Sequence, residues 1–304
     1  MVSLGSKLGK ISKKNAYLCM LNFRSMPRID IGAVVAAKAP RLARWIPRPA
    51  IEWLRRTVHE KEINHILANY WELPPQEFIR ACFREWGVSY SMEGLERLDP
   101  AGRYLFVANH PFGGMDGMML ADELIGRFGD ARVVVNDLLM HVEPLRPLWL
   151  PVNKHGAQCA AYARRMEEAF AGDVPVLTFP AGLCSRREGG TVSDTPWRTN
   201  FLKKAAAAQR TIVPVFVEGR LSDFFYRLAS LRKRAGLKFN IEMLWLVDEM
   251  FAQRGRSFRL VAGEPIPPDR LRAAGSLREQ ADYVRKKTYS LEKKIAGQRK
   301  AAEK

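Results

Sequence analysis

The spacing of apolar residues changes close to residue 100, and this change predicts two kinds of structure along the chain. Over residues 29–86 apolar positions recur at helical spacing, with prolines between the segments. Ile51, Leu54 and Val58, for example, share one face of an amphipathic helix. Such helices either pack on a core or lie on a membrane, and packing is the more common outcome. We therefore expect a basic, helical N-terminal region over residues 1–93, with apposition to a membrane as the alternative to packing.

Beyond residue 100, short β-like runs alternate with helical segments. This alternation predicts an α/β domain over residues 94–268, with a mixed, largely parallel sheet flanked by helices. A basic C-terminal helix is expected over residues 269–304. The expected strands are Tyr104–Ala108, Arg132–Val135, Val174–Phe179, Thr211–Val217, Phe239–Leu244 and Phe258–Ala262, and the expected helices between them are Gly117–Arg127, Gln158–Ala171 and Trp197–Gln209.

The chain is strongly basic, with 304 residues and a formal net charge of +17 from 49 Lys and Arg against 32 Asp and Glu. Such a charge indicates an anionic partner: membrane lipid, the phosphates of a carrier molecule, or nucleic acid. No apolar stretch approaches the roughly 20 residues that cross a bilayer, so we expect no transmembrane helix. The N-terminal lysines precede no long apolar segment, which disfavours a secretory signal. The four cysteines lie far apart and without metal-ligand spacing, so we expect reduced thiols and no metal.

The first candidate for chemistry is a glycine-rich turn after the first strand of the α/β region. Residues 109–116 read Asn-His-Pro-Phe-Gly-Gly-Met-Asp, at a strand end where α/β sheets place catalytic groups. Asp116 can accept the Nδ1 proton of His110, which leaves Nε2 free to take a proton from a hydroxyl. The amides of Gly113 and Gly114 can approach a developing oxyanion. On spacing alone, a structural turn in which Asp116 only caps the next helix is equally well supported.

The second candidate lies at another strand end, after the strand expected at Val174–Phe179. It contains Ser185, Arg186 and Arg187, and arginine suits the bidentate capture of a phosphate or carboxylate. The alternative is a solvated arginine pair. Cys184 stands beside them, but no second base accompanies it in the motif, which disfavours a nucleophilic cysteine.

We call residues 109–116 the first block and residues 179–187 the second block. Together the two blocks resemble the signatures of the glycerolphosphate and lysophospholipid acyltransferase family, which are Asn-His-x4-Asp and Phe-Pro-Glu-Gly-Thr-Arg-Ser. Leu150–Lys154 lies where the family has its acceptor-binding block. Ile212–Val215 and Gly263–Ile266 resemble its later strand motifs. The blocks occur in the family's order over residues 94–268, which makes the set far more specific than either block alone.

Two departures from the family pattern point to a particular branch. One additional residue stands between His110 and Asp116, and a loop containing two glycines can absorb it. Ala181 replaces the glutamate of the second block. This variant pattern resembles a hemolysin-like branch, which includes bacterial O-acyltransferases that complete amino-acid lipids such as glycine or ornithine lipids.

The resemblance implies an O-acyltransferase that moves a fatty acyl group from a thioester of acyl carrier protein or coenzyme A directly to the hydroxyl of a lyso-lipid, without a cofactor. His110 would be the general base and Asp116 would orient it. Because of Ala181, a lyso-amino-acid lipid is the preferred acceptor and lysophosphatidic acid the alternative. The residues expected to contact substrate are Gly113, Gly114, Asn153, Ser185, Arg186 and Arg187.

A second basic cluster, interleaved with aromatic residues, spans Arg220–Lys238. It suits an anionic membrane surface, a solvated helix face or, least well, nucleic acid. The sequence has no RNA-recognition, zinc-finger or clear helix-turn-helix pattern, so we expect no nucleic acid partner. The expectation is a cytoplasmic enzyme bound peripherally to the inner face of the cell membrane. The alternatives from another class are a basic nucleic-acid-binding protein and a non-catalytic membrane-binding protein.

Overall fold

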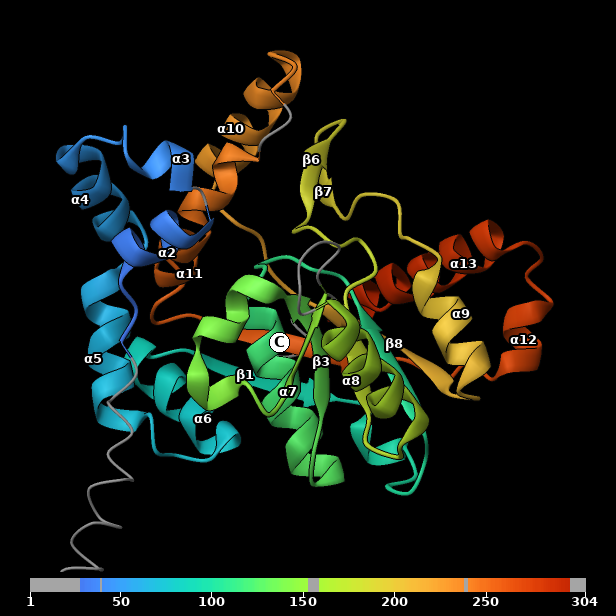
Figure 1. The fold of residues 1–304 in the computed structure, drawn as a ribbon. Coiled ribbons are helices and arrows are strands. Elements are labelled where there is room, and N and C mark those ends of the chain that lie inside the picture. Colours follow the sequence, from blue (N-terminus) through green and yellow to red (C-terminus); the bar gives the residue numbers. More distant parts are fainter. Residues whose placement is uncertain (1–27, 39, 153–158, 238–239, 296–304) are drawn as a thin grey trace, which may run out of the picture.

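The computed structural model describes residues 28–38, 40–152, 159–237 and 240–295, and these contain a seven-stranded sheet with the order β1-β9-β8-β2-β5-β3-β4 (Figure 1). Neighbouring strands are parallel except for the antiparallel pair of β8 and β9, which confirms the mixed, largely parallel sheet. The strands are β1 (Ser89–Glu93), β2 (Tyr104–Ala108), β3 (Arg132–Asn136), β4 (Trp149–Val152), β5 (Val176–Thr178), β8 (Thr211–Val217) and β9 (Ser257–Ala262), and a separate hairpin joins β6 (Arg186–Glu188) to β7 (Thr191–Ser193).

Helices cover both faces of the sheet, so the central strand β2 is buried along its whole length. Phe106 and Ala108 belong to a core shared with α6 and α7, whereas Leu105 and Val107 belong to a core shared with α8, α9 and α13. The helices are α2 (Ile31–Lys38), α3 (Pro40–Ala43), α4 (Arg48–Thr57), α5 (Glu60–Tyr70), α6 (Pro75–Trp86), α7 (Met115–Phe128), α8 (Cys159–Ala171), α9 (Asn200–Ala207), α10 (Asp223–Arg234), α11 (Leu246–Phe251), α12 (Pro268–Arg272) and α13 (Leu277–Ser290).

The α/β core extends beyond the boundaries expected from the sequence. Strand β1 precedes residue 94 and pairs with β9, and α6 places Phe78 and Ile79 in the same core as Phe106. At the other end, Ala281 and Val284 of α13 pack in the second core. The sheet therefore shares its core with helices from both flanking regions.

One expected strand is wrong. Ile241–Trp245, which overlaps the strand expected at Phe239–Leu244, is a 3-10 helix, here called η4. The side chain of Glu242 is fully buried and forms ion pairs with Arg186 and Arg232. These contacts hold the segment against α10, away from the sheet. In the described ranges, no helix is sufficiently long and apolar to cross a membrane.

Candidate active site

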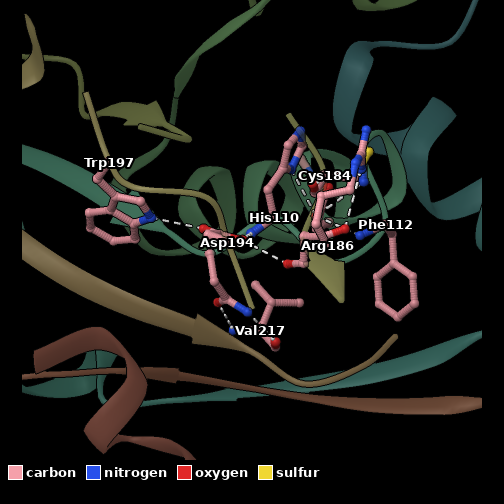
Figure 2. Close-up of polar contacts among 12 residues, drawn as sticks. His110, Phe112, Cys184, Arg186, Asp194, Trp197 and Val217 are labelled. Carbon is pink, nitrogen blue, oxygen red and sulfur yellow. Dashed lines mark hydrogen bonds and ion pairs between the residues drawn. The ribbon is translucent and has the colours of Figure 1, made fainter. Parts of the chain in front are cut away.

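The two sequence blocks meet because β2 and β5 are parallel neighbours, so that their carboxyl ends lie at one edge of the sheet. The amide of Ser185 donates a hydrogen bond to the carbonyl of His110 over 2.8 Å. The His110 ring also stacks on Phe179, with ring centroids 4.1 Å apart. Strand pairing and these contacts bring the first block and the second block into one site (Figure 2).

His110 and Asp116 form a hydrogen-bonded pair at this edge. The Nδ1 atom of His110 lies 2.9 Å from Oδ2 of Asp116, which is fully buried in the first turn of α7. The carboxylate also accepts the backbone amides of Phe112, Gly113 and Gly117, at 3.1, 3.4 and 2.9 Å. These donors offset the cost of burying its charge and fix its orientation.

The pKa of His110 reflects opposing influences. Burial lowers it, but the charge and hydrogen bond of Asp116 and the charge of Asp194 outweigh burial and the nearby Arg186 guanidinium. The net result is a pKa above the ordinary value of histidine. A base of this kind accepts a proton more readily than an isolated imidazole.

Gly113 allows the additional residue between His110 and Asp116. Its φ of +83° is rarely adopted by other residues, and a Cβ here would lie 2.7 Å from Leu246 and 2.8 Å from the Cys184 sulfur. Gly114, which caps α7, has open space at the same position. Because the Gly113 amide points to Asp116, it helps to hold the carboxylate in this structure.

Asn109 ties the end of β2 to the end of β8. Its amide nitrogen donates to the carbonyl of Val217 at 2.9 Å, and its amide oxygen accepts from the Val217 amide at 2.7 Å. The pair of bonds fixes the backbone immediately before His110.

Arg186 does not occupy the position expected for a head-group contact. It is buried and donates to the carbonyl of Cys184 at 2.8 Å and to Glu242 at 3.1 Å. Arg187 is more exposed and pairs with Asp223, which also accepts from Arg220. The second block therefore has one structural arginine and one arginine near the surface.

The remaining expected residues differ in their placement. The hydroxyl of Ser185 donates to Asp194 at 2.7 Å and is buried. Asn153 lies outside the described residues. Burial raises the pKa of the Cys184 thiol to about 12, which keeps it protonated and unsuited to nucleophilic attack.

Two buried carboxylates at the site, Asp194 and Glu242, were not identified from the sequence. Both lie outside the blocks, and each has a partner in a block that is distant along the chain, His110 for Asp194 and Arg186 for Glu242. No pattern in the sequence marks these two residues, because the burial of their charges becomes visible only once the fold is known.

Comparison with known proteins identifies the class of enzyme. A family model described as acyltransferase matches residues 33–297. The chain belongs to this acyltransferase family. The match extends over most of the chain and confirms the resemblance carried by the two blocks.

This chain covers nearly the full length of two curated relatives. A lyso-glycine lipid O-acyltransferase of Bacteroides thetaiotaomicron is 40% identical over 265 residues, which are 86% of this chain and 97% of that relative. A lyso-glycine lipid O-acyltransferase of Phocaeicola vulgatus is 38% identical over 276 residues, which are 90% of this chain and 99% of that relative. Both names agree with the expected O-acyltransferase class.

Among solved structures, the chain is similar to the crystal structure of the 1-acyl-sn-glycerophosphate (LPA) acyltransferase PlsC from Thermotoga maritima. The sequence identity is 16% and the TM-score is 0.41, with 80% of this chain and 95% of that chain covered.

Proposed function

We propose that this acyltransferase moves a fatty acyl group from an acyl-carrier-protein or coenzyme A thioester to the hydroxyl of a lyso-lipid with a glycine head group. The observation that carries the proposal is the His110–Asp116 pair at the carboxyl edge of the sheet. The names of the two relatives, each about 40% identical, support the choice of acceptor. Lysophosphatidic acid remains the second candidate acceptor.

His110 acts as the general base in this proposal. The Asp116 carboxylate accepts the hydrogen bond from Nδ1 of His110, so Nε2 is the atom that takes the hydroxyl proton. The hydroxyl oxygen then attacks the thioester carbonyl. The tetrahedral oxyanion collapses to the new ester and expels the thiolate, which receives the proton from the imidazolium. The acyl group passes directly to the acceptor, with no acyl-enzyme intermediate.

Backbone amides near Gly113 and Gly114 would stabilise the oxyanion. The Gly113 amide already donates a hydrogen bond to the Asp116 carboxylate, at 3.4 Å, and would have to leave it to bind the oxyanion. Gly114 is therefore the better candidate of the two as an oxyanion donor.

Arg187 is the better candidate for the head group of the acceptor. It shares the carboxylate of Asp223 with Arg220, so two guanidinium groups face one carboxylate. The excess positive charge suits the carboxylate of a glycine lipid, which arginine can bind through two parallel hydrogen bonds. Replacing Arg187 by lysine should raise KM for the acceptor more than it lowers kcat, because lysine keeps the charge and loses the paired geometry.

We further propose that one face of the protein binds anionic membrane lipid, from which the acceptor is drawn. Helices α3, α4 and α10 project from the same side of the sheet (Figure 1). Trp53 of α4 contacts Trp245, which contacts Phe224 of α10, at ring-centroid distances of 5.3 and 5.6 Å. The large apolar side chains exposed here are Trp45 (84% exposed), Trp53, Phe224, Leu231 and Leu237.

Cations surround these apolar side chains, as expected for a protein that rests at a bilayer interface. Exposed basic residues on or next to these helices include Arg44, Arg48, Arg56, Arg220, Arg227, Lys233 and Arg234. With this face against the membrane, the enzyme would work peripherally, on the cytoplasmic side.

Vesicle co-sedimentation tests the membrane proposal. Binding should increase with anionic lipid content and fall when Arg227, Lys233 and Arg234 are changed to glutamate. A matched control changes three exposed cations elsewhere, Lys203, Arg270 and Lys294. Binding that is independent of anionic lipid, or equally weakened by both sets, would contradict the proposal.

Lipid mass spectrometry of cells with and without this chain tests the choice of acceptor. Deletion should cause the monoacylated glycine lipid to accumulate and the diacylated form to disappear. Complementation by the His110→Ala variant should fail. Accumulation of lysophosphatidic acid instead would favour the second candidate.

A further inference from the structure

A second buried carboxylate lies next to His110. Asp194, which follows β7 and is 3% exposed, accepts the backbone amide of His110 at 3.2 Å and the Ser185 hydroxyl at 2.7 Å through Oδ1. Its Oδ2 accepts the indole N–H of Trp197 at 2.9 Å. Figure 2 shows Asp194 between His110 and Trp197.

Asp194 is itself held from the opposite side by α13. Its backbone amide donates to the Tyr289 hydroxyl at 2.7 Å, and its carbonyl accepts from Arg285 at 2.7 Å. The carboxylate is therefore fixed by both its side-chain partners and its backbone. It has little freedom to rotate and joins the first block, the second block and α13 at one point.

We propose that Asp194 is a positioning residue for the reaction, which fixes the backbone of His110 and holds the imidazole at the angle needed for proton transfer. The inference rests on the proposed role of His110 as general base. Asp116 fixes the ring through Nδ1, whereas Asp194 fixes the main chain that bears the ring. Two separate anchors are needed because displacement of a catalytic group by about 1 Å can cost on the order of 10²-fold in rate.

The charge of Asp194 has a second effect, on protonation of the imidazole. The charged groups that influence His110 are Asp116 of α7, Asp194, and Arg186 of β6. The two carboxylates raise the pKa of His110 and the guanidinium lowers it. Loss of the Asp194 charge therefore lowers that pKa, and the acid limb of the rate profile moves to lower pH.

A double variant separates charge from packing. Asp194→Asn keeps an acceptor for His110 but places an N–H2 group against the Trp197 indole, so it is combined with Trp197→Phe. Because Asn keeps the acceptor for the His110 amide and removes only the charge, we expect the acid limb to shift to lower pH while kcat on the plateau and KM for the acceptor change little. The single Trp197→Phe variant is the control and should keep the acid limb of the wild-type protein.

A conservative variant keeps the inference testable if the double variant does not fold. Asp194→Glu keeps the charge and displaces the carboxylate, so kcat should fall while the acid limb stays in place. Folded Asp194→Glu protein with the wild-type kcat would overturn the positioning role. A folded double variant with an unchanged pH profile would overturn the electrostatic role of Asp194.

An NMR titration distinguishes failure of this inference from failure of the proposed function. The chain has five histidines, and the His110→Ala variant assigns the resonance of His110. In the double variant the His110 pKa should lie below that of the Trp197→Phe control, whether or not the acceptor lipid has been identified correctly. An unchanged His110 pKa would contradict the electrostatic part of the inference. If the wild-type protein is inactive on lyso-glycine lipid but the His110 pKa still differs between the double variant and the control, only the proposed acceptor is contradicted.

Discussion

The Nδ1 atom of His110 lies 2.9 Å from Oδ2 of Asp116, although five residues separate the two along the chain. The loop closes because Gly113 adopts a positive φ and lets the chain turn back before α7 begins. Three backbone amides then bind the Asp116 carboxylate. The longer spacing is therefore compatible with an imidazole–carboxylate pair of ordinary hydrogen-bond length.

The first prediction concerns the charge of Asp116. Asp116→Asn keeps the size of the side chain but removes the negative charge and turns an N–H2 group toward an N–H donor, so the pKa of His110 falls. We expect kcat to fall on the order of 10²-fold, and the acid limb of the pH–rate profile to move to lower pH. Steady-state kinetics between pH 5 and 9 measures both. A folded variant whose acid limb moves to higher pH would contradict the assigned electrostatics.

The second prediction compares two adjacent glycines. Gly113→Ala forces a side chain into left-handed backbone and into contact with Leu246 and Cys184, so it should destabilise the protein by about 1–3 kcal/mol. Gly114→Ala meets open space and should change stability by less than about 0.5 kcal/mol. Urea denaturation of the two variants gives the comparison. Equal destabilisation would mean that the loop is built differently.

The third prediction concerns Cys184. Because burial raises its thiol pKa to about 12, the thiolate is scarce at neutral pH and the residue serves as a small apolar side chain. Cys184→Ala should retain acyl transfer within a few-fold. Single-turnover kinetics should give no acyl-enzyme in either protein. Trapping of an acyl group on Cys184 would require a nucleophilic cysteine instead of direct transfer.

The fourth prediction concerns Glu242, which is fully buried between two guanidinium groups. Glu242→Gln leaves the charges of Arg186 and Arg232 without a carboxylate, and we expect a loss of about 3 kcal/mol in the free energy of unfolding. The matched control is Glu188→Gln, which breaks an exposed pair with Lys233. The control should cost less than about 1 kcal/mol. Similar losses in the two variants would mean that Glu242 is more hydrated than the structure indicates.

The main strands and the contact between His110 and Asp116 could be predicted from sequence because their signals are local. Tyr104–Ala108 and Thr211–Val217 are continuous apolar runs, and His110 and Asp116 share one turn. The segment Phe239–Leu244 also resembles a strand, but Glu242 is drawn to arginines 56 and 10 residues away. Local periodicity does not report such distant ion pairs.

Asp194 shows the same limit at the candidate active site. It bonds to residues 84 and 95 positions away, and no sequence motif surrounds it. The arginines of the second block show that neighbours in sequence can also differ, because these two adjacent residues with identical side chains have different surroundings. Arg186 is buried by η4 and α10, whereas Arg187 lies near the surface. Only the three-dimensional packing distinguishes them.

The most direct test of the central claim is the rate of acyl transfer by the purified protein and its His110→Ala variant. The assay supplies an acyl thioester and monoacylated glycine lipid, and mass spectrometry detects the diacylated product. Circular dichroism and thermal unfolding verify that the variant is folded. We predict that the wild-type protein forms the product and that the variant is slower by about 10²–10⁴-fold. A folded His110→Ala protein that transfers the acyl group at the wild-type rate would contradict the claim.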